Sequence, residues 1–205
     1  MGTMERRDRE KRKMREQILK SAMKLFLREG FEKVTIRRIA EEIEYSPATI
    51  YLYFKDKNEI LYELHEQGFE ELHKRQQEMF AVKDPLDRLR RHGLAYIAFA
   101  LEKPEYYDLM FIMRGPARKF KKGEEWKAGR RSYELLRTNI EDCIAAGYLP
   151  GGNLDVAAFS IWSLVHGIVS LIIRERCSMF PQEKLKAIAE GALEYSIGKI
   201  RGAQR

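Results

Sequence analysis

The sequence predicts an all-α protein of about nine helices, in which an N-terminal helix-turn-helix precedes a C-terminal helical bundle. Apolar residues recur three and four positions apart along most of the 205 residues, the spacing of helices that bury one face. Asn-Gly and Asp-Gly pairs, which mark tight β-hairpins, do not occur, and no alternating apolar stretch is long enough to indicate a strand. Pro and Gly interrupt the helical pattern at intervals, which predicts the breaks between helices.

The first three helices are expected to be one long helix and two short ones. An apolar stripe runs from Met14 to Phe26 and stops at Gly30, a typical C-terminal end. Thr35 is the expected N-cap of a second, short helix with one apolar face. Ser46 and Pro47 suit the cap and first position of a third helix, which should run to about residue 54. A fourth helix is expected to begin near residues 56–58.

Two short helices joined by a tight turn and packed on a longer one form a helix-turn-helix. Ile50 and Phe54, four residues apart, should pack inward, which leaves Ala48, Thr49 and Tyr51 outward and Tyr53 on the flank. Tyrosine on a helix is more often half-buried core than a ligand contact. Beside the basic residues at 37, 38, 55 and 57, however, a phenol suits hydrogen bonding to DNA phosphate, so the pattern predicts DNA binding.

Residues 15–64 resemble the DNA-binding domain of the TetR family of transcriptional repressors. The resemblance is carried by VTIRRIA at 34–40, SPATIYLYF at 46–54 and KNEIL at 57–61. It implies DNA contacts from Thr35, Arg37, Arg38, Ser46, Pro47, Ala48, Thr49, Tyr51, Tyr53 and Lys57. Among these, Thr35, Tyr51, Tyr53 and Lys57 would hold phosphates, Arg37 would reach phosphate or a base edge, and residues 47–49 would face the major groove.

One residue departs from the family pattern in the turn of the motif. The family usually has Gly there, and this chain has Glu44. If Glu44 adopts a positive φ, it carries strain of about 1 kcal/mol or more.

The rest of the chain is expected to form a second helical domain, so that the domains are 1–60 and 61–205. Helices are expected at 86–102, 104–113, 124–147, 154–177 and 182–201. The stretch 156–173 has no charged residue apart from a histidine and touches the lower length limit of a transmembrane helix. We favour a central helix buried on all sides, because this is the one such segment and it contains serines and a histidine.

The last two expected helices suit a dimer interface. The final helix has one apolar stripe with small residues, and two such helices from each copy would form a four-helix interface about a two-fold axis. Trp162, His166 and Gly167 resemble a Trp-x-x-x-His-Gly signature of one C-terminal subfamily of these regulators.

The family resemblance implies a small-molecule effector, apolar or anionic, bound among the middle helices of the second domain. The candidate lining residues are Phe99, Tyr106, Tyr107, Met110, Phe111, Trp126, Tyr133, Trp162 and His166. Most of these side chains could equally be ordinary core, and His166 in an apolar helix is more often a core histidine than a ligand contact.

The net charge of +7 is compatible with a polyanionic partner. Residues 1–20 carry eight basic and four acidic side chains, and residues 114–131 carry eight and two. Either cluster could be a solvated face. The second could also be a mobile loop, an entrance that attracts an anionic effector, or an additional contact with DNA phosphates.

Enzyme and metal chemistry have little support in the sequence. The two cysteines and four histidines lack metal-ligand spacing, and no nucleophile elbow or phosphate-binding glycine loop occurs. We expect no catalytic residues, no metal and no cofactor. The few cysteines and an N-terminus without an apolar core favour a cytoplasmic protein. The expected function is a homodimeric, ligand-responsive repressor on a palindromic DNA operator, without membrane contact. The alternatives are an architectural DNA-binding protein and a helical-bundle enzyme.

Overall fold

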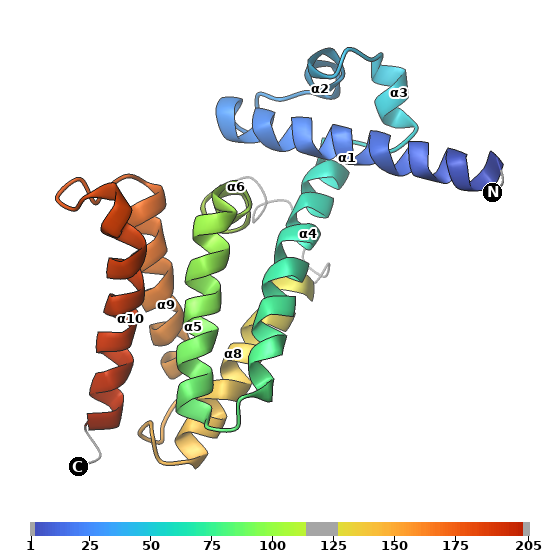
Figure 1. Cartoon of the computed structure of the whole chain (residues 1–205). Coiled ribbons are helices and arrows are strands. Elements are labelled where there is room, and N and C mark those ends of the chain that lie inside the picture. The colour runs from blue at the N-terminus through green and yellow to red at the C-terminus, as the bar shows by residue number, and fades with distance from the viewer. Residues whose placement is uncertain (1–2, 114–126, 203–205) are drawn as a thin grey trace. The chain divides into compact units, whose positions relative to one another are not determined.

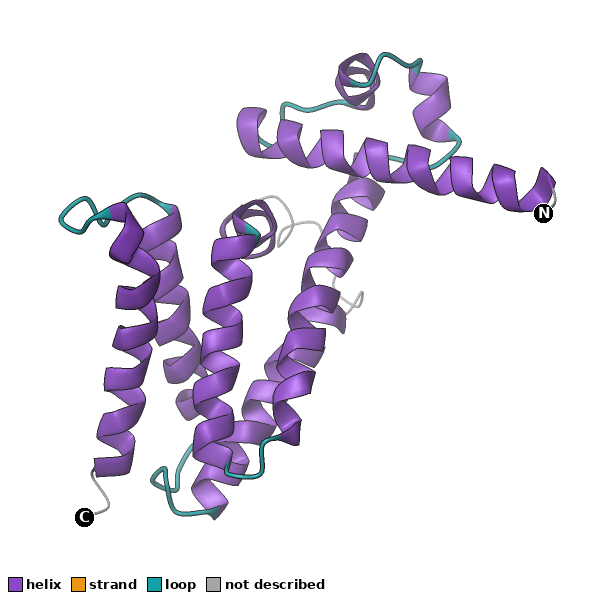
Figure 2. Ribbon diagram, viewed as in Figure 1, coloured by secondary structure: helices purple, strands orange, loops and turns teal. Residues whose placement is uncertain are grey.

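The computed structural model describes residues 3–113 and 127–202, and within these ranges it contains nine α-helices and no strand (Figures 1 and 2). Trp126 and the part of the basic segment before Lys127 lie outside the described residues. The chain divides into two compact units. The first comprises residues 3–68 and 105–113, and the second comprises residues 69–104 and 127–202. The all-α prediction is confirmed.

The first unit contains α1 (Thr3–Glu29), α2 (Ile36–Glu42), α3 (Pro47–Tyr51) and the start of α4 (Lys57–Glu78). The predicted end of α1 at Gly30 and the predicted N-caps of α2 and α3 are confirmed. Gly30 has a φ of +84°, and its N–H donates to the Phe26 carbonyl oxygen at 3.0 Å. Thr35 and Ser46 accept hydrogen bonds from backbone N–H groups three residues ahead.

The third helix is shorter than predicted and ends at Tyr51. The N–H groups of Leu52 and Tyr53 donate to carbonyl oxygens three residues back, at 3.2 and 2.9 Å. These bonds tighten the chain into a turn, which carries Phe54 into the core without a further helical turn. Phe54 is fully buried, as predicted.

The core of the first unit joins all of its helices. Ile18, Phe26, Ile39, Ile50 and Phe54 belong to one buried cluster, which confirms the predicted inward faces. Burying a large apolar side chain of this kind stabilises a fold by roughly 1.5–3 kcal/mol. The three helices therefore support one another although α2 and α3 are too short to be stable alone.

The segment predicted as one helix at 104–113 is α6 (Pro104–Tyr107) followed by a π-helical turn, η2 (Asp108–Ile112). Leu109 of η2 belongs to the buried cluster of the first unit. Gly68 of α4 admits the close approach of η2, because a Cβ atom at Gly68 would lie 2.5 Å from the Met110 sulfur.

The second unit is a bundle around α5 (Pro85–Glu102). This helix contacts α8 (Lys127–Ala145), α9 (Leu154–Ile173) and α10 (Leu185–Gly202). Two short 3₁₀ helices, η1 (Met79–Ala81) and η3 (Gln182–Lys184), precede α5 and α10. A Cβ atom at Gly93 would lie 2.7 Å from the Leu193 side chain, so this glycine lets α5 and α10 approach closely.

The prediction that residues 156–173 form a central helix buried on all sides is wrong for the single chain. The central helix is α5, and α9 packs on its neighbours through Ala158, Val165 and Val169. Phe159 of α9 is 60% exposed, and Val156 and Leu171 are exposed as well. Helix α9 has the length and composition to cross a membrane, with a mean hydropathy of 2.1, but a soluble helix with an apolar face at an interface has the same properties.

Helix α9 also ends earlier than predicted, at Ile173 rather than near Cys177. Glu175 has a φ of +54°, and the Arg176 N–H donates to the Leu171 carbonyl oxygen at 2.8 Å. This left-handed cap closes the helix without the glycine that usually occupies such a position.

Candidate nucleic-acid interface and the interior of the second unit

The N-terminal half of α3 and its cap present small side chains on a buried base. The Ser46 hydroxyl accepts a hydrogen bond from the Thr49 N–H at 3.2 Å and shares another with the Thr49 hydroxyl at 3.0 Å. Pro47 and Ala48 are exposed, and Ile50 is buried beneath them. A short helix with this surface can enter a major groove, because nothing bulky separates its N-terminal residues from the base edges.

The two tyrosines of this segment differ in environment. Tyr51 is 58% exposed and points outward, as predicted. Tyr53 is half-buried and packs against the core of the first unit. Tyr51 is therefore the tyrosine whose hydroxyl is free to reach a phosphate, whereas much of the Tyr53 ring supports the fold.

The start of α2 offers a second contact point. Thr35 is exposed, and its hydroxyl accepts a hydrogen bond from the Arg38 N–H at 3.1 Å. The Arg37 side chain is exposed, and it pairs with Glu41 at 3.2 Å on the helix surface. An exposed pair of this kind contributes little to stability, so Arg37 can exchange Glu41 for a phosphate.

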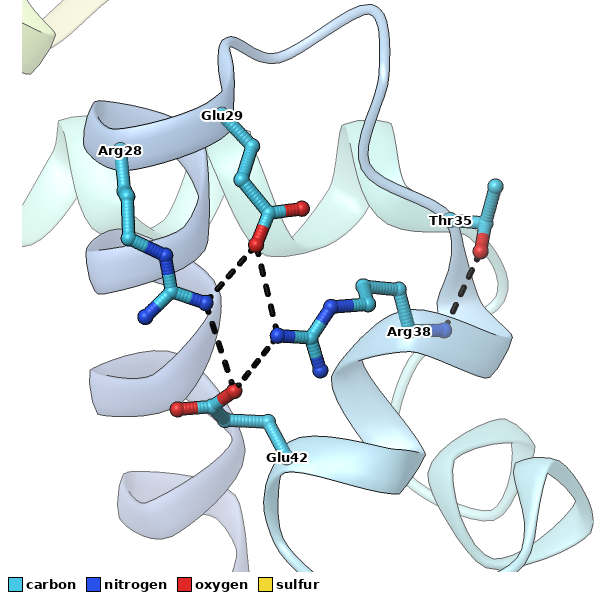
Figure 3. Close-up of polar contacts among 5 residues, drawn as sticks. All are labelled: Arg28, Glu29, Thr35, Arg38 and Glu42. Carbon is cyan, nitrogen blue, oxygen red and sulfur yellow. Dashed lines mark hydrogen bonds and ion pairs between the residues drawn. The ribbon is translucent and has the colours of Figure 1, made fainter.

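Arg38 has a different environment and joins α1 to α2 (Figure 3). Its guanidinium pairs with Glu29 at 3.3 Å and with Glu42 at 3.0 Å. Arg28 completes the network, since it pairs with the same two carboxylates at 2.7 and 3.5 Å. The Arg28 hydrogen bond, with Arg38 nearby, lowers the pKa of Glu29. The structure thus places Arg38 in a network of ion pairs that links α1 to α2.

Lys57 is engaged with the backbone that leads into α2. Its ammonium group donates to the carbonyl oxygens of Phe31 at 2.8 Å, Glu32 at 3.2 Å and Val34 at 2.8 Å. The same group lies 4.6 Å from the centre of the Phe31 ring. An ammonium has three N–H donors, so these three bonds use all of them. In this geometry Lys57 positions the loop before Thr35.

Glu44 has a φ of +59°, so this residue does adopt the left-handed conformation in which strain is expected. A residue other than glycine in this region carries strain of about 1 kcal/mol. The turn between α2 and α3 keeps its form because both flanking helices are anchored in the core.

The aromatic residues predicted to line an effector site fall into both units. In the second unit the Trp162 ring contacts two others. Its centre lies 6.3 Å from that of Tyr133 and 5.8 Å from that of His166. Phe99 is fully buried beside Arg75, 5.6 Å from its guanidinium. Tyr106, Tyr107, Met110 and Phe111 belong to the first unit. There Tyr107 and Phe111 are in ring contact at 5.4 Å, and Tyr106 donates to the Gln67 side chain at 3.0 Å.

Sequence reasoning missed a set of buried polar side chains in the second unit. Arg88 of α5 is 8% exposed and donates to the Asn139 side-chain oxygen of α8 at 2.8 Å. It also pairs with Asp142 and lies 4.8 Å from the centre of the Phe80 ring. His92, one turn further along α5, is 3% exposed. Its burial, and to a smaller extent the positive charge of Arg88, lowers its pKa to about 4.

Several polar atoms of this interior have no hydrogen-bond partner among the residues that the structure describes. They are both ring nitrogens of His92, the side-chain nitrogen of Asn139, the side-chain oxygen of Gln76 and the hydroxyl of Ser132. An unpaired polar group in an apolar interior costs about 1–3 kcal/mol. Such groups therefore indicate a place for a bound molecule or for ordered water. The sequence feature that could have predicted these buried polar groups is the placement of Arg88 and His92, four residues apart, on the apolar face of α5.

Within the described ranges, no group of three or more His, Cys, Asp or Glu side chains could hold a metal ion.

Tyr96 and His166 share a hydrogen bond at 3.3 Å, and burial lowers the pKa of His166.

A helix-turn-helix with an exposed reading face, joined to a larger helical bundle, defines a DNA-binding transcriptional regulator. Two family profiles match the chain. "Bacterial regulatory proteins, tetR family" covers residues 18–64, and "Tetracyclin repressor-like, C-terminal domain" covers residues 89–194. The chain belongs to the TetR family of regulators.

Relatives of known name agree with this assignment. The transcriptional regulator TcmR of Streptomyces glaucescens is 39% identical over 54 residues, 26% of this chain and 24% of TcmR. The regulator HbdR of Aromatoleum sp. (strain CIB) is 28% identical over 163 residues, 74% of this chain and 67% of HbdR. The matched parts thus span a quarter of TcmR and two thirds of HbdR.

Among solved structures, FadR of Bacillus subtilis in complex with stearoyl-CoA has a TM-score of 0.65 and 16% identity. The alignment covers 87% of this chain and 95% of FadR. This likeness shows a shared fold.

Proposed function

We propose that the protein is a homodimeric, cytoplasmic repressor that binds a palindromic DNA operator and is released by a small molecule bound in its second unit. The observation that carries the proposal is the exposed face of α3. Its small N-terminal residues and Tyr51 lie over the fully buried Ile50, which is what a reading helix needs.

The proposed DNA contacts divide into positioning and reading groups. Thr35, Arg37 and Tyr51 hold phosphates, which sets the register of the domain without selecting a sequence. Residues 47–49 face the bases and select the operator. Arg38 and Lys57 act indirectly, because their ion pairs and hydrogen bonds hold the helices that present the other groups.

The proposed dimer interface is the exposed apolar face of α9 and α10. Phe159 and Leu171 of α9 and Tyr195 of α10 are exposed. Gly167 and Gly191 have open space where a Cβ atom would be, so another helix can approach closely there. A second copy related by a two-fold axis would cover this face and would place two reading helices on successive half-sites, about 34–36 Å apart.

The proposed effector has an apolar body and at least one polar group. The unpaired atoms of His92, Asn139, Gln76 and Ser132 support this class, because a ligand that pairs with them gains hydrogen bonds in an otherwise apolar interior. Stearoyl-CoA, which FadR of the same fold binds, makes acyl thioesters the first compounds to test.

The proposed switch is a population shift. An effector that binds better to the conformation with mismatched reading heads lowers the population that fits the operator. A shift from 1:99 to 99:1 needs an affinity difference of about 10⁴-fold between the two states, so a weakly selective effector would give partial release.

Selection of duplexes from a random DNA pool by the purified protein tests the proposal. The expected result is one enriched sequence with two-fold symmetry, bound at least roughly 10³-fold tighter than random duplex at physiological salt. Binding to all duplexes with similar affinity would instead indicate an architectural protein. Release of the selected duplex by an acyl-CoA panel tests the effector class, and His92→Leu should reduce the response.

A further inference from the structure

We propose that the N-terminal extension of α1, residues 5–13, is an accessory DNA-binding arm whose Lys11 and Arg12 contact phosphates on the operator flank. The proposal rests on the operator binding proposed above. The family profile for the DNA-binding domain begins at Ile18, so the matched family region does not include this segment.

The extension is helical but has no core of its own. Helix α1 has 27 residues and is about 40 Å long, yet every residue from 5 to 13 is exposed. Burial begins with Met14 and Arg15, which are half-buried, and is complete at Ile18. Figure 1 shows the N-terminal end of α1 continuing past α3.

The face of the extension that matters is fixed by Arg15. Its guanidinium donates to the Tyr53 carbonyl oxygen at 3.0 Å and to Glu63 at 2.9 Å, and it lies 4.4 Å from the centre of the Phe54 ring. This side of α1 therefore faces the chain that leaves α3. It is the same stripe that buries Ile18 and the residues after it.

One turn earlier, the same stripe is basic and uncovered. Asp8, Lys11, Arg12 and Arg15 are spaced at three, four and seven residues and line one open surface hollow of about 510 Å³. The stripe thus changes from apolar beneath the reading helix to cationic beyond it. A surface of this kind continues the DNA-facing side of the domain.

The charge of the extension is available for a polyanion. Residues 5–13 hold six basic and three acidic side chains, a surplus of three. Arg6 forms an ion pair with Glu10 at 2.9 Å, which takes up one basic and one acidic side chain and leaves the surplus of three unchanged. Among the described residues no acidic side chain pairs with Lys11 or Arg12. When an operator duplex is bound to α3, its phosphates form the polyanion closest to Lys11 and Arg12.

The test uses salt dependence, because each phosphate contact changes the slope of log K against log salt by roughly 0.9. The probe is the duplex that the wild-type protein enriches from a random pool, flanked by ten further base pairs on each side. The double variant Lys11→Gln, Arg12→Gln should lower this slope. The decrease should be roughly two if one of the two side chains contacts a phosphate in each subunit of the dimer, and roughly four if both do.

A matched control lies on the same helix. Arg6→Gln with Lys13→Gln removes the same charge from exposed positions on the side of α1 away from Lys11 and Arg12, and it should leave the slope within about half a unit of wild type. All four positions are outside the core, so both variants should unfold at the wild-type urea concentration. Hydroxyl-radical footprints should lose flank protection in the first variant and keep it in the second.

Equal slope changes in the two variants, or no change in either, would overturn the arm. Wild-type binding to one enriched duplex, with an unchanged slope in the first variant, would overturn the arm and leave operator binding intact. Failure to enrich any duplex would instead overturn the proposed function and the arm together.

Discussion

The ammonium group of Lys57 donates a hydrogen bond to the carbonyl oxygen of Val34 at 2.8 Å, across 23 residues of sequence. This bond joins the first residue of α4 to the loop that presents Thr35. With the further bonds to Phe31 and Glu32, it makes Lys57 a clamp on the entry to α2. A residue that the family resemblance associates with phosphate binding is thus fully used inside the protein.

Lys57→Met should therefore lower both stability and operator affinity. Hydrogen bonds from charged donors contribute roughly 1.5–3 kcal/mol, so the free energy of unfolding should fall by about 2 kcal/mol. Operator binding should weaken because Thr35 is less well placed, while its salt dependence stays at the wild-type value. Urea unfolding and operator titrations at several salt concentrations measure the two effects. Unchanged stability with a slope lower by about one per subunit would show that Lys57 contacts phosphate instead.

Tyr51→Phe removes one exposed hydroxyl from the reading helix. We expect operator binding to weaken by about 1 kcal/mol, one phosphate hydrogen bond, without a change in the ranking of operator variants. Replacement of Ala48 or Thr49 should alter that ranking. Titration of single-base operator variants measures both, with Tyr62→Phe as a control on an exposed tyrosine of α4. A reordered ranking in Tyr51→Phe would contradict the positioning role.

Ala192→Glu places a charge on the partly exposed side of α10, beside the apolar face proposed for dimerisation. Burial of an unpaired carboxylate in a dimer interface is costly, so the variant should yield monomers or insoluble protein. Sedimentation at micromolar concentration measures the assembly state. Ala146→Glu, the same change at an exposed position after α8, should remain dimeric. A wild-type protein that sediments as a monomer would remove the basis for the dimer.

Stability should fall as the pH decreases below about 6.5. Burial lowers the pKa of His92, and also that of His65, to about 4. The unfolded chain takes up these protons near pH 6.5, whereas the folded chain stays neutral until about pH 4. Below pH 6.5 the unfolded state therefore binds more protons, and each histidine lowers the free energy of unfolding by up to about 3 kcal/mol.

The comparison of wild type with His92→Gln isolates one of these contributions. Between pH 4.5 and 6.5 the free energy of unfolding should change less steeply with pH in the variant, by about 1.4 kcal/mol per pH unit. The slope is compared rather than the absolute stability, because the substitution also changes packing. An identical slope in both proteins would mean that His92 takes up its proton equally in the folded and unfolded states.

Glu44→Gly should stabilise the fold by roughly 1 kcal/mol, because glycine adopts a φ of +59° without steric strain. Glu175→Gly, at a φ of +54° after α9, tests the same effect away from the reading helix. Urea unfolding measures both variants. Destabilisation in both would show that the backbone entropy of glycine outweighs the strain.

The local features of the fold could be predicted from the sequence alone. Thr35 and Ser46 cap their helices as expected, Gly30 ends α1, and the spacing of Ile50 and Phe54 places both in the core. These features depend on residues within about four positions of one another. Hydrogen-bond capping and helical periodicity act over that range, so a short stretch of sequence is sufficient to specify them.

The tertiary structure decided the relationships between distant residues. Lys57 reaches Val34, and Arg88 reaches Asn139 across 51 residues, because packed helices bring them together. Composition alone could not show that α5 is the central helix and that α9 leaves Phe159 exposed, since an apolar helix suits a core and an interface equally. Which face of each helix finds a partner is a property of the assembled bundle, and so the buried polar interior around His92 emerged only with the fold.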